Sequence, residues 1–197
     1  MKVVIIKYNA GNIRSVLFAL ERIGINAIVT DNHEEIRSAD RVIFPGVGEA
    51  STAMEYLRDR GLDKLICSLT QPVLGICLGM QLMCKFSEEN MTVCLGIFNE
   101  TVKRFPDTTG FKIPQIGWNN IYGLKSNLFE GVSEDSYMYF VHSYYVESCP
   151  NAIAKTDYIA EFSSALHKNN FYAVQFHPEK SGEAGQRILE NFIQLKV

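Results

Sequence analysis

The sequence predicts an α/β fold: a doubly wound, mostly parallel sheet with helices on both faces and an antiparallel or mixed extension in its second half. Over residues 3–76, short apolar runs alternate with segments whose apolar residues recur at helical spacing, which is typical of parallel strands joined by crossover helices. Over residues 99–176, strand-like runs follow one another with turns between them and without long helices. The length of 197 residues suits one domain, which we expect to span residues 1–197.

In the first half, each expected strand is a short apolar run, and each expected helix starts or stops at a residue that favours a helix terminus. Residues 3–8 (VVIIKY) predict a buried strand, and Asn12 is expected to cap a helix that ends at Gly24. The same reasoning gives strands at 25–30, 41–44 and 73–76, and helices at 34–39, 49–60, 61–69 and 78–86.

The second half predicts a series of strands that pack as an extension on the same sheet. These strands are expected at 99–105, 113–122, 137–147, 151–156, 159–167 and 171–176. A helix should then start at Ser181-Gly182, because four apolar residues after this point share one helical face: Ile188, Leu189, Phe192 and Ile193.

Composition and charge exclude several classes of protein. The chain is 47% hydrophobic and 21% charged with a net charge of −3, and no basic run indicates a nucleic-acid partner. The opening apolar run is too short for a signal-peptide core or a membrane span, so we expect a cytoplasmic protein that does not bind membranes. Five cysteines without a C-x-x-C pair argue against a disulfide framework or structural zinc, and we expect neither a metal nor a cofactor.

Three expected strand ends carry unusual residues. They are Pro45–Gly48, Gly75–Gly79 and His177–Glu179. Ligands of open α/β sheets bind beyond the carboxyl ends of the strands, so these three segments predict the position of the site.

Residues Gly75-Ile76-Cys77-Leu78-Gly79 have the spacing of a nucleophile elbow, with cysteine in place of the usual serine. Glycines on either side let neighbouring backbone approach, and the helix that follows would place its N-terminus near the sulfur and favour the thiolate. The alternative is a buried structural thiol, because free cysteine is among the most buried residue types.

A thiolate nucleophile needs a proton shuttle, and His177 is the best of the four histidines. It follows an apolar strand, and the carboxylate of Glu179 can fix the tautomer of its ring. The alternative for this His-Pro-Glu segment is an ordinary turn with a surface ion pair. We expect His33 and His167 in solvated surface turns, and His142 in a structural or substrate-lining position rather than a catalytic one.

The motifs G-I-C-L-G-M-Q and F-H-P-E together resemble those of glutamine amidotransferases with a Cys-His-Glu triad, which have a flavodoxin-like core. The further blocks K-Y-N-A-G-N-I-R-S-V, P-G-V-G, G-W-N, Y-F-V-H-S-Y and H-P-E-K-S-G resemble the glutaminase subunits of imidazole glycerol phosphate synthase, from histidine biosynthesis. The resemblance runs from near residue 1 to the C-terminal helix.

The resemblance implies that Cys77 attacks the side-chain amide of L-glutamine, with His177 as the proton shuttle and Glu179 orienting it. The oxyanion hole would use the backbone of Gly46, Val47, Gly48 and Leu78, and a peptide flip in Pro45–Gly48 would switch a poorly assembled resting site on. The alternative for Pro45–Gly48 is a plain strand-to-helix turn.

The resemblance also implies a glutamine pocket lined by Gln81, Glu89 and the backbone of Tyr139–Tyr144, which includes His142, Ser143 and Tyr144. Glu89 would pair with the α-ammonium group of glutamine. The alternatives are helical packing for Gln81 and a solvated loop for Glu89.

Ammonia is mostly protonated at neutral pH, and the resemblance implies a (β/α)8-barrel cyclase subunit that receives it through a sheltered route. Residues expected to face this partner, in a heterodimer, are Asn12, Trp118, Tyr139 and Lys180. Core packing is the alternative for Trp118.

Lys7 and Asn9 stand where members of this family often have aspartate and glycine, which leaves the acceptor open. The alternatives are a glutaminase subunit that feeds another ammonia-accepting synthase, or a non-catalytic regulatory subunit on the same fold.

Overall fold

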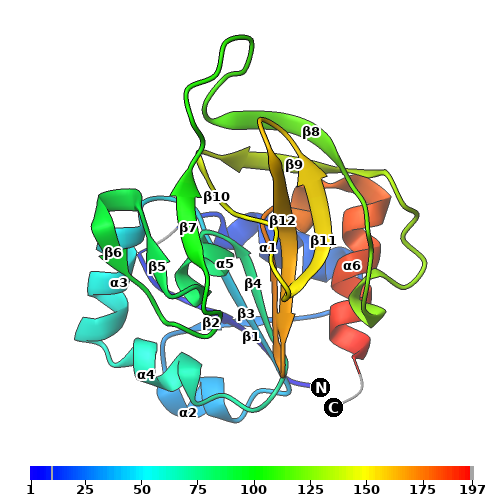
Figure 1. The fold of residues 1–197 in the computed structure, drawn as a ribbon. Coiled ribbons are helices and arrows are strands. Elements are labelled where there is room, and N and C mark those ends of the chain that lie inside the picture. Colours follow the sequence, from blue (N-terminus) through cyan, green and yellow to red (C-terminus); the bar gives the residue numbers. More distant parts are fainter. Residues whose placement is uncertain (10, 196–197) are drawn as a thin grey trace.

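The computed structural model describes residues 1–9 and 11–195, and a seven-stranded sheet forms its centre (Figure 1). The strand order is β11-β12-β13-β4-β3-β1-β2. From β13 to β2 all neighbouring strands are parallel. At the other end of the sheet, β12 is antiparallel to both of its neighbours, β13 and β11. The strands are β1 (Val3–Ile6), β2 (Ile28–Thr30), β3 (Arg41–Gly46), β4 (Val73–Cys77), β11 (Ala152–Asp157), β12 (Glu161–Lys168) and β13 (Phe171–Val174).

Helices cover both faces of this sheet, as the sequence predicts. Alternate residues of a strand point to opposite faces, so Val3 and Ile5 pack with helices α1 (Ile13–Arg22) and α6 (Gly182–Gln194). Val4 and Ile6 pack with the helices of the other face, which are α2 (His33–Arg37), α3 (Ala50–Asp59), α4 (Leu62–Cys67) and α5 (Leu78–Met83). In Figure 1, α6 in red and α3 and α4 in cyan lie on opposite sides of the sheet.

The prediction that the second-half strands extend the main sheet is only partly right, because β11, β12 and β13 join that sheet and the other strands do not. A four-stranded sheet has the order β10-β7-β5-β6, and β8 pairs with β9 in a separate hairpin. These strands are β5 (Phe86–Ser87), β6 (Thr92–Val93), β7 (Thr101–Arg104), β8 (Gln115–Ile121), β9 (Ser136–His142) and β10 (Tyr144–Val146), and single 3-10 turns lie at Glu89–Met91, Asn127–Phe129 and Pro178–Lys180.

Two expected elements differ clearly from the structure. The continuous strand expected at 137–147 breaks at Ser143, because β9 pairs with β8 while β10 pairs with β7. The helix expected at 78–86 ends at Met83, because Cys84 is extended and the chain then enters β5. In both places tertiary pairing overrides the local pattern.

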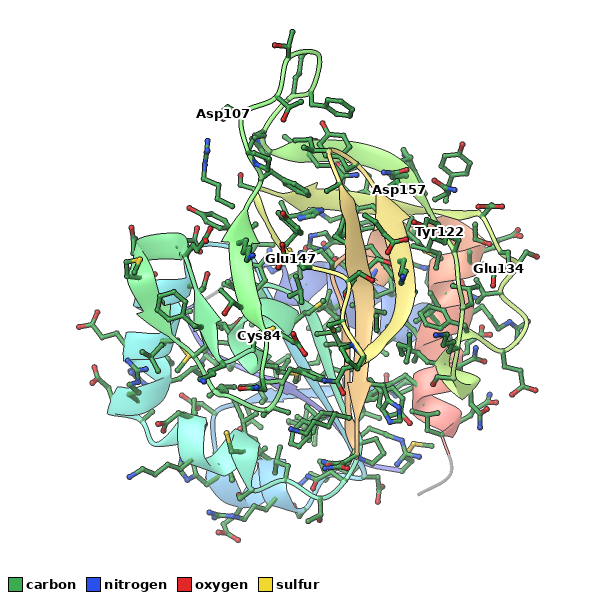
Figure 2. All side chains as sticks on the ribbon, in the orientation of Figure 1. Cys84, Asp107, Tyr122, Glu134, Glu147 and Asp157 are labelled. Atoms are coloured by element: carbon green, nitrogen blue, oxygen red, sulfur yellow. The ribbon has the colours of Figure 1, made fainter. Side chains whose placement is uncertain are left out.

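The β8–β9 hairpin is tied to the main sheet at the residue that follows β8. Tyr122 and Lys155 exchange two backbone hydrogen bonds of 2.9 Å. The Tyr122 hydroxyl contacts a carboxylate oxygen of Asp157 and one of Glu161, both at 2.9 Å, and Figure 2 shows Tyr122 beside Asp157. These contacts hold the hairpin over the sheet edge formed by β11 and β12.

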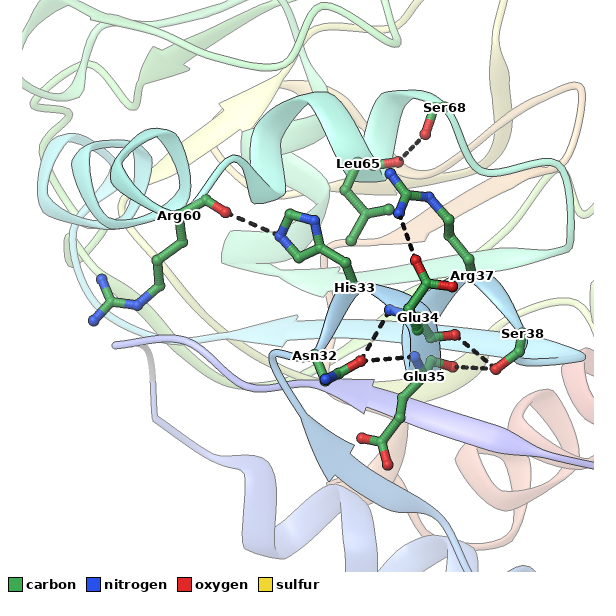
Figure 3. Close-up of polar contacts among 9 residues, drawn as sticks. All are labelled: Asn32, His33, Glu34, Glu35, Arg37, Ser38, Arg60, Leu65 and Ser68. Carbon is green, nitrogen blue, oxygen red and sulfur yellow. Dashed lines mark hydrogen bonds and ion pairs between the residues drawn. The ribbon is translucent and has the colours of Figure 1, made fainter.

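Helix α2 begins with a side-chain cap, which Figure 3 shows. Asn32 Oδ1 accepts hydrogen bonds from the backbone amides of Glu34 at 2.9 Å and Glu35 at 3.1 Å. The solvated turn expected for His33 is wrong: His33 is the first residue of α2, and its Nε2 donates to the carbonyl of Arg60, at the end of α3, at 2.9 Å. His167 also differs from expectation, because it lies in β12 and stacks on Tyr172.

All five cysteines are free in this structure. Cys77, Cys84 and Cys94 are buried, and Figure 2 shows Cys84 in the interior. Within residues 1–9 and 11–195, no cluster of three or more His, Cys, Asp or Glu side chains is arranged to hold a metal ion. Over the same residues, no helix is long and apolar enough to cross a membrane.

Strands β13, β4 and β3 are neighbours, so the three strand ends that carry unusual residues meet at one edge of the sheet. Gly46 pairs with Cys77, and Val174 pairs with Ile76. Two glycines make this junction compact. A Cβ on Gly79 would overlap the carbonyl oxygen of Phe44 in β3, and one on Gly75 would lie 2.9 Å from Met83 Sδ and 3.0 Å from backbone of α5.

The contact between Gly79 and β3 predicts a large stability loss for Gly79→Ala. Inserting a methyl group against fixed backbone should cost about 3 kcal/mol of unfolding free energy, because neither β3 nor α5 can shift freely. Urea denaturation measures this cost. Gly24→Ala is the control: nothing lies within 4 Å of its new Cβ, so only its φ of +78° opposes the substitution, at about 1 kcal/mol. Equal losses in the two variants would contradict the packing argument.

Candidate active site

Cys77 occupies a strained backbone position at the junction of β4 and α5. Its φ is 54° and its ψ is −108°, a conformation that costs a non-glycine residue on the order of 1–3 kcal/mol. The side chain is 6% exposed and lines a pocket. Its sulfur lies 3.7 Å from the carbonyl oxygen of Val141. The geometry therefore favours the elbow prediction over a structural thiol packed in the core.

His177 and Glu179 lie together beyond β13, and both are buried. The Nδ1 atom of His177 is 2.8 Å from Glu179 Oε1, so Nδ1 carries the proton and Nε2 is left for the sulfur. Burial by itself lowers the pKa of His177, but hydrogen bonding and charge from Cys77 and Glu179 outweigh it and raise that pKa to about 10. The arrangement thus favours a protonated imidazole beside the sulfur of Cys77.

The backbone of His177 is held from two sides. Its amide donates to the carbonyl of Tyr139 in β9 at 2.9 Å. The Ser181 hydroxyl donates to the carbonyl of His177 at 2.6 Å and accepts from the amide of Tyr139 at 3.0 Å. The ring therefore has a defined position relative to the hairpin that carries Trp118.

Asn12 lies at the start of α1, but it does not cap that helix as expected. Its φ is 74° and its side chain makes no capping hydrogen bond. Instead Asn12 Nδ2 donates to Glu179 Oε1, and it lies 3.4 Å from His177 Nδ1. Two donors, Asn12 Nδ2 and His177 Nδ1, thus converge on one oxygen of Glu179, so Asn12 helps to fix the position of this carboxylate.

The expected oxyanion residues surround Cys77. Val47, Gly48 and Leu78 line the same pocket as the sulfur, and Gly46 pairs with Cys77 across β3 and β4. The φ of Gly48 is +124°, which only glycine adopts readily, and the carbonyl of Val47 accepts from the amide of Gly11 at 3.4 Å. Pro45 and Gly46 extend β3 beyond the expected end at 44.

All five residues expected to bind glutamine line this pocket: Gln81, Glu89, His142, Ser143 and Tyr144. Val141, within the expected Tyr139–Tyr144 segment, lines it as well, and so does Pro114, which nothing in the sequence pattern singled out. Glu89 is half-buried rather than in a solvated loop, and its carboxylate accepts from the amide of Ala50, at the start of α3, at 2.7 Å. Burial raises the pKa of Glu89 and Glu49 adds to this, while the Ala50 amide lowers it.

His142 is a buried, neutral group. Its Nδ1 donates to the carbonyl of Tyr144 at 2.7 Å, because a carbonyl only accepts, and its Nε2 lies 3.0 Å from the side-chain amide of Gln115. Burial, aided by the charge of His177 and opposed by the bond to Tyr144, lowers the pKa of His142 to about 4. This supports the structural or substrate-lining interpretation.

Three of the four residues expected at a partner interface lie together on the surface. Trp118 is 56% exposed, so the core alternative for it is wrong, and its ring lies 5.9 Å from that of Tyr139. Lys180 Nζ lies 5.9 Å from the Tyr139 ring. Ile116 and Tyr137 on the same hairpin are also exposed. Asn12 is the fourth, and its contacts are with Glu179 and His177.

Sequence reasoning missed two buried polar residues around the sulfur. Gln175 is fully buried and its Nε2 lies 3.7 Å from Cys77 Sγ. Tyr8 is buried with a hydroxyl that contacts no polar partner among the described residues, and burial, followed by the charge of Cys77, raises its pKa. Gln175 lies two residues before His177 in the apolar run at 171–176, and a polar residue inside such a run is the signal that was available.

The lowered pKa of His142 predicts an acid-sensitive fold. Because the unfolded chain binds this proton near pH 6.5 and the folded chain near pH 4, unfolding free energy should fall by about 3 kcal/mol as the pH falls through that window. His142→Gln should remove this part of the pH dependence in urea denaturation. His167→Gln, at a strand surface, should keep it. If the unfolding free energy of His142→Gln depended on pH as strongly as that of the wild type, His142 would not be the source of the acid sensitivity.

Comparison with known proteins shows the family of this chain. The family model of class-I glutamine amidotransferases matches residues 4–195. The imidazole glycerol phosphate synthase subunit HisH of Bacteroides fragilis is 61% identical over 196 residues, which cover 99% of this chain and 100% of the relative. The protein of the same name from Pasteurella multocida is 47% identical over 98% of this chain and 97% of its own length.

Solved structures agree on the fold. A crystal structure of a glutamine amidotransferase superposes with a TM-score of 0.76 at 19% identity and covers 98% of both chains. The structure of PurLQS from Thermotoga maritima superposes with a TM-score of 0.73 at 14% identity and covers 98% of this chain and 97% of that one. The chain therefore belongs to the class-I glutamine amidotransferase family and, within it, to the family of imidazole glycerol phosphate synthase HisH subunits.

Proposed function

We propose that the chain is the glutaminase subunit of an imidazole glycerol phosphate synthase. It hydrolyses L-glutamine to glutamate and delivers ammonia to a cyclase subunit, which makes imidazole glycerol phosphate and aminoimidazole carboxamide ribonucleotide in histidine biosynthesis. The observation that carries the chemistry is the meeting of Cys77, His177 and Glu179 at the ends of β4 and β13. The 61% identity to a subunit named for this synthase carries the choice of acceptor.

The chemistry begins with attack of the Cys77 thiolate on the side-chain amide carbon of glutamine. The resulting tetrahedral intermediate collapses when imidazolium His177 gives its proton to the departing nitrogen, which leaves as ammonia and a γ-glutamyl thioester on the sulfur. His177 then takes a proton from water, whose oxygen attacks the thioester and releases glutamate. Glu179 keeps Nδ1 of His177 protonated and stabilises the imidazolium in each step.

The negative oxygen of each tetrahedral intermediate needs positioned donors. The amide of Leu78 and an amide from Gly46, Val47 or Gly48 are the proposed donors, and one such donor contributes about 3–4 kcal/mol in other enzymes. The carbonyl of Val47 is bonded to the amide of Gly11 in this structure. A turn of this peptide would break that contact, which supports the proposed switch from a resting to an active site.

Glutamine is held by the polar groups on the far side of the pocket. Glu89 would accept from the α-ammonium group, and Gln81, Ser143 and the backbone of Tyr144 would bind the rest of the amino acid. The raised pKa of Glu89 reflects burial without a cationic partner, and a bound ammonium group would supply that partner.

The ammonia must reach its acceptor unprotonated, which requires a partner docked at the site. We place a (β/α)8-barrel cyclase subunit on the exposed apolar hairpin surface formed by Ile116, Trp118, Tyr137 and Tyr139, with Lys180 at its edge. Exposed aromatic clusters of this kind are typical of protein interfaces. Asn12 would sense the partner through its contact with Glu179.

The cytoplasm is the proposed location of the protein. Its five free cysteines suit this reducing compartment.

The second candidate, a different acceptor synthase, finds no specific support at Lys7 or Asn9. Lys7 is exposed, and Asn9 Nδ2 donates to the carbonyl of Thr52 at 3.1 Å. Among the described residues, neither side chain hydrogen-bonds to Cys77, His177 or Glu179, so neither departure alters the proposed glutaminase chemistry.

Glutamate release from glutamine, measured with the chain alone and with a cyclase subunit and its ribonucleotide ligand, tests the proposal. We expect strong stimulation by the partner and a fall of more than about a thousandfold in Cys77→Ser, whose fold should be intact by circular dichroism. Turnover unaffected by the cyclase would contradict the proposed acceptor. Turnover retained in Cys77→Ser would contradict the proposed nucleophile, and a wild-type complex with the cyclase subunit that releases no glutamate would favour the non-catalytic alternative.

Trp118→Ala should weaken binding to the cyclase subunit about 30-fold, because an exposed aromatic anchor at an interface contributes about 2 kcal/mol. Titration calorimetry measures this affinity. Phe18→Ala removes an equally exposed aromatic side chain from α1, outside the hairpin, and should leave the affinity unchanged. Unchanged affinity in Trp118→Ala would contradict the proposal, because the cyclase subunit would then bind a different surface.

A further inference from the structure

We propose that Gln175 holds the thiolate of Cys77 by donating a side-chain N–H to its sulfur, and that Gln81 fixes the orientation of that amide. The inference deepens the proposed function, because it concerns the state of the nucleophile before glutamine binds. It is carried by a continuous chain of hydrogen bonds that starts at a backbone carbonyl and ends at the sulfur.

The backbone carbonyl of Tyr144 sets the direction of this chain. A carbonyl only accepts hydrogen bonds, so the side-chain atom of Gln81 that lies 3.1 Å from it must be the nitrogen, Nε2. The same nitrogen lies 3.1 Å from the side chain of Gln175. Both hydrogens of Gln81 Nε2 are then used, and the atom of Gln175 that faces it must be the oxygen, Oε1.

With its oxygen bound to Gln81, Gln175 can present only its nitrogen to Cys77. The distance from Gln175 Nε2 to Cys77 Sγ is 3.7 Å, within the range of hydrogen bonds to sulfur. The hydrogen-bond partners of Gln175 therefore fix which atom of its side-chain amide is the nitrogen and which is the oxygen. An amide N–H directed at sulfur favours the thiolate over the thiol.

Burial and register make this donor effective. Gln175 is fully buried and Gln81 is 5% exposed, so water competes little for either amide. Val174 pairs with Ile76, so Gln175 follows β13 beside the point where Cys77 ends β4. The backbone N–H of Gln175 donates to the carbonyl of Ser164 at 2.9 Å. The backbone at both ends of the contact is therefore held by the main sheet.

The other groups around the sulfur explain why such a donor is needed. The carbonyl of Val141, 3.7 Å from Cys77 Sγ, accepts a hydrogen bond from a thiol but repels a thiolate. His177 beyond β13 and Tyr8 beyond β1 are the titratable groups coupled electrostatically to the sulfur, and Glu179 acts through His177. Glu89, His142 and Tyr144 line the same pocket. Gln175 adds a neutral donor that offsets this repulsive carbonyl, and it keeps the same charge at every pH.

Alkylation of Cys77 by iodoacetamide, followed over pH and quantified on the Cys77 peptide by mass spectrometry, tests the inference without glutamine turnover. The thiolate attacks the carbon that bears iodine, forms the S–C bond and releases iodide. Gln175→Met keeps the shape of the side chain without the donor, so the half-maximal rate should move to higher pH. At pH 7 the rate should fall about tenfold, which corresponds to about 1.4 kcal/mol. Gln175→Glu, which places a carboxylate against the sulfur, should slow it further.

Gln115→Met is the matched control, because it removes another buried amide that contacts His142 rather than the sulfur, and its alkylation profile should match that of the wild type. In the cyclase complex, Gln175→Met should lower kcat for glutamine about tenfold with little change in KM. An unchanged alkylation profile in either folded Gln175 variant would overturn the inference. A shifted profile in a chain that hydrolyses no glutamine even with its partner would overturn the proposed function and leave this inference standing.

Discussion

The strained backbone of Cys77 is the constraint on which the rest of the site depends. A cysteine at φ 54° persists only where the surroundings leave no alternative, and here those surroundings are β4 on one side and α5 on the other. Gly79 lets α5 pack against the backbone of β3, and Gly75 lets it pack against β4. The stability of the buried sheet offsets the local cost and holds the sulfur at the strand end.

Once the sulfur is fixed, the polar groups around it divide into two chains. Asn12, Glu179 and His177 form one, which places a protonated imidazole at the sulfur. Gln81 and Gln175 form the other, which begins at the carbonyl of Tyr144 and ends at the same atom. The first chain reaches α1 and the β9 hairpin, and the second reaches the wall of the pocket. A docked partner and a bound substrate would therefore act on the nucleophile from different sides.

The parallel half of the fold and the residues at its strand ends were predictable, because each depends on local pattern. Apolar β-branched runs define β1, β3 and β4, and glycines and proline at their ends mark the elbow and the oxyanion segment. What could not be predicted depends on pairing between distant residues. The break at Ser143 arises because β9 and β10 have different partners, and the contact of Asn12 with Glu179 joins residues 167 positions apart. Gln175 resembled an ordinary strand residue until β13 was placed beside β4.

The most direct measurement of the central claim is covalent trapping with a glutamine analogue that carries a diazoketone in place of the side-chain amide. The complex with the cyclase subunit would be incubated with this analogue, with and without excess glutamine, and its peptides mapped by mass spectrometry. The account predicts one adduct, on Cys77, which glutamine prevents. An adduct on Cys67, Cys84, Cys94 or Cys149 with Cys77 unmodified would contradict it, because the pocket would then not present the Cys77 sulfur to the reacting carbon of its substrate.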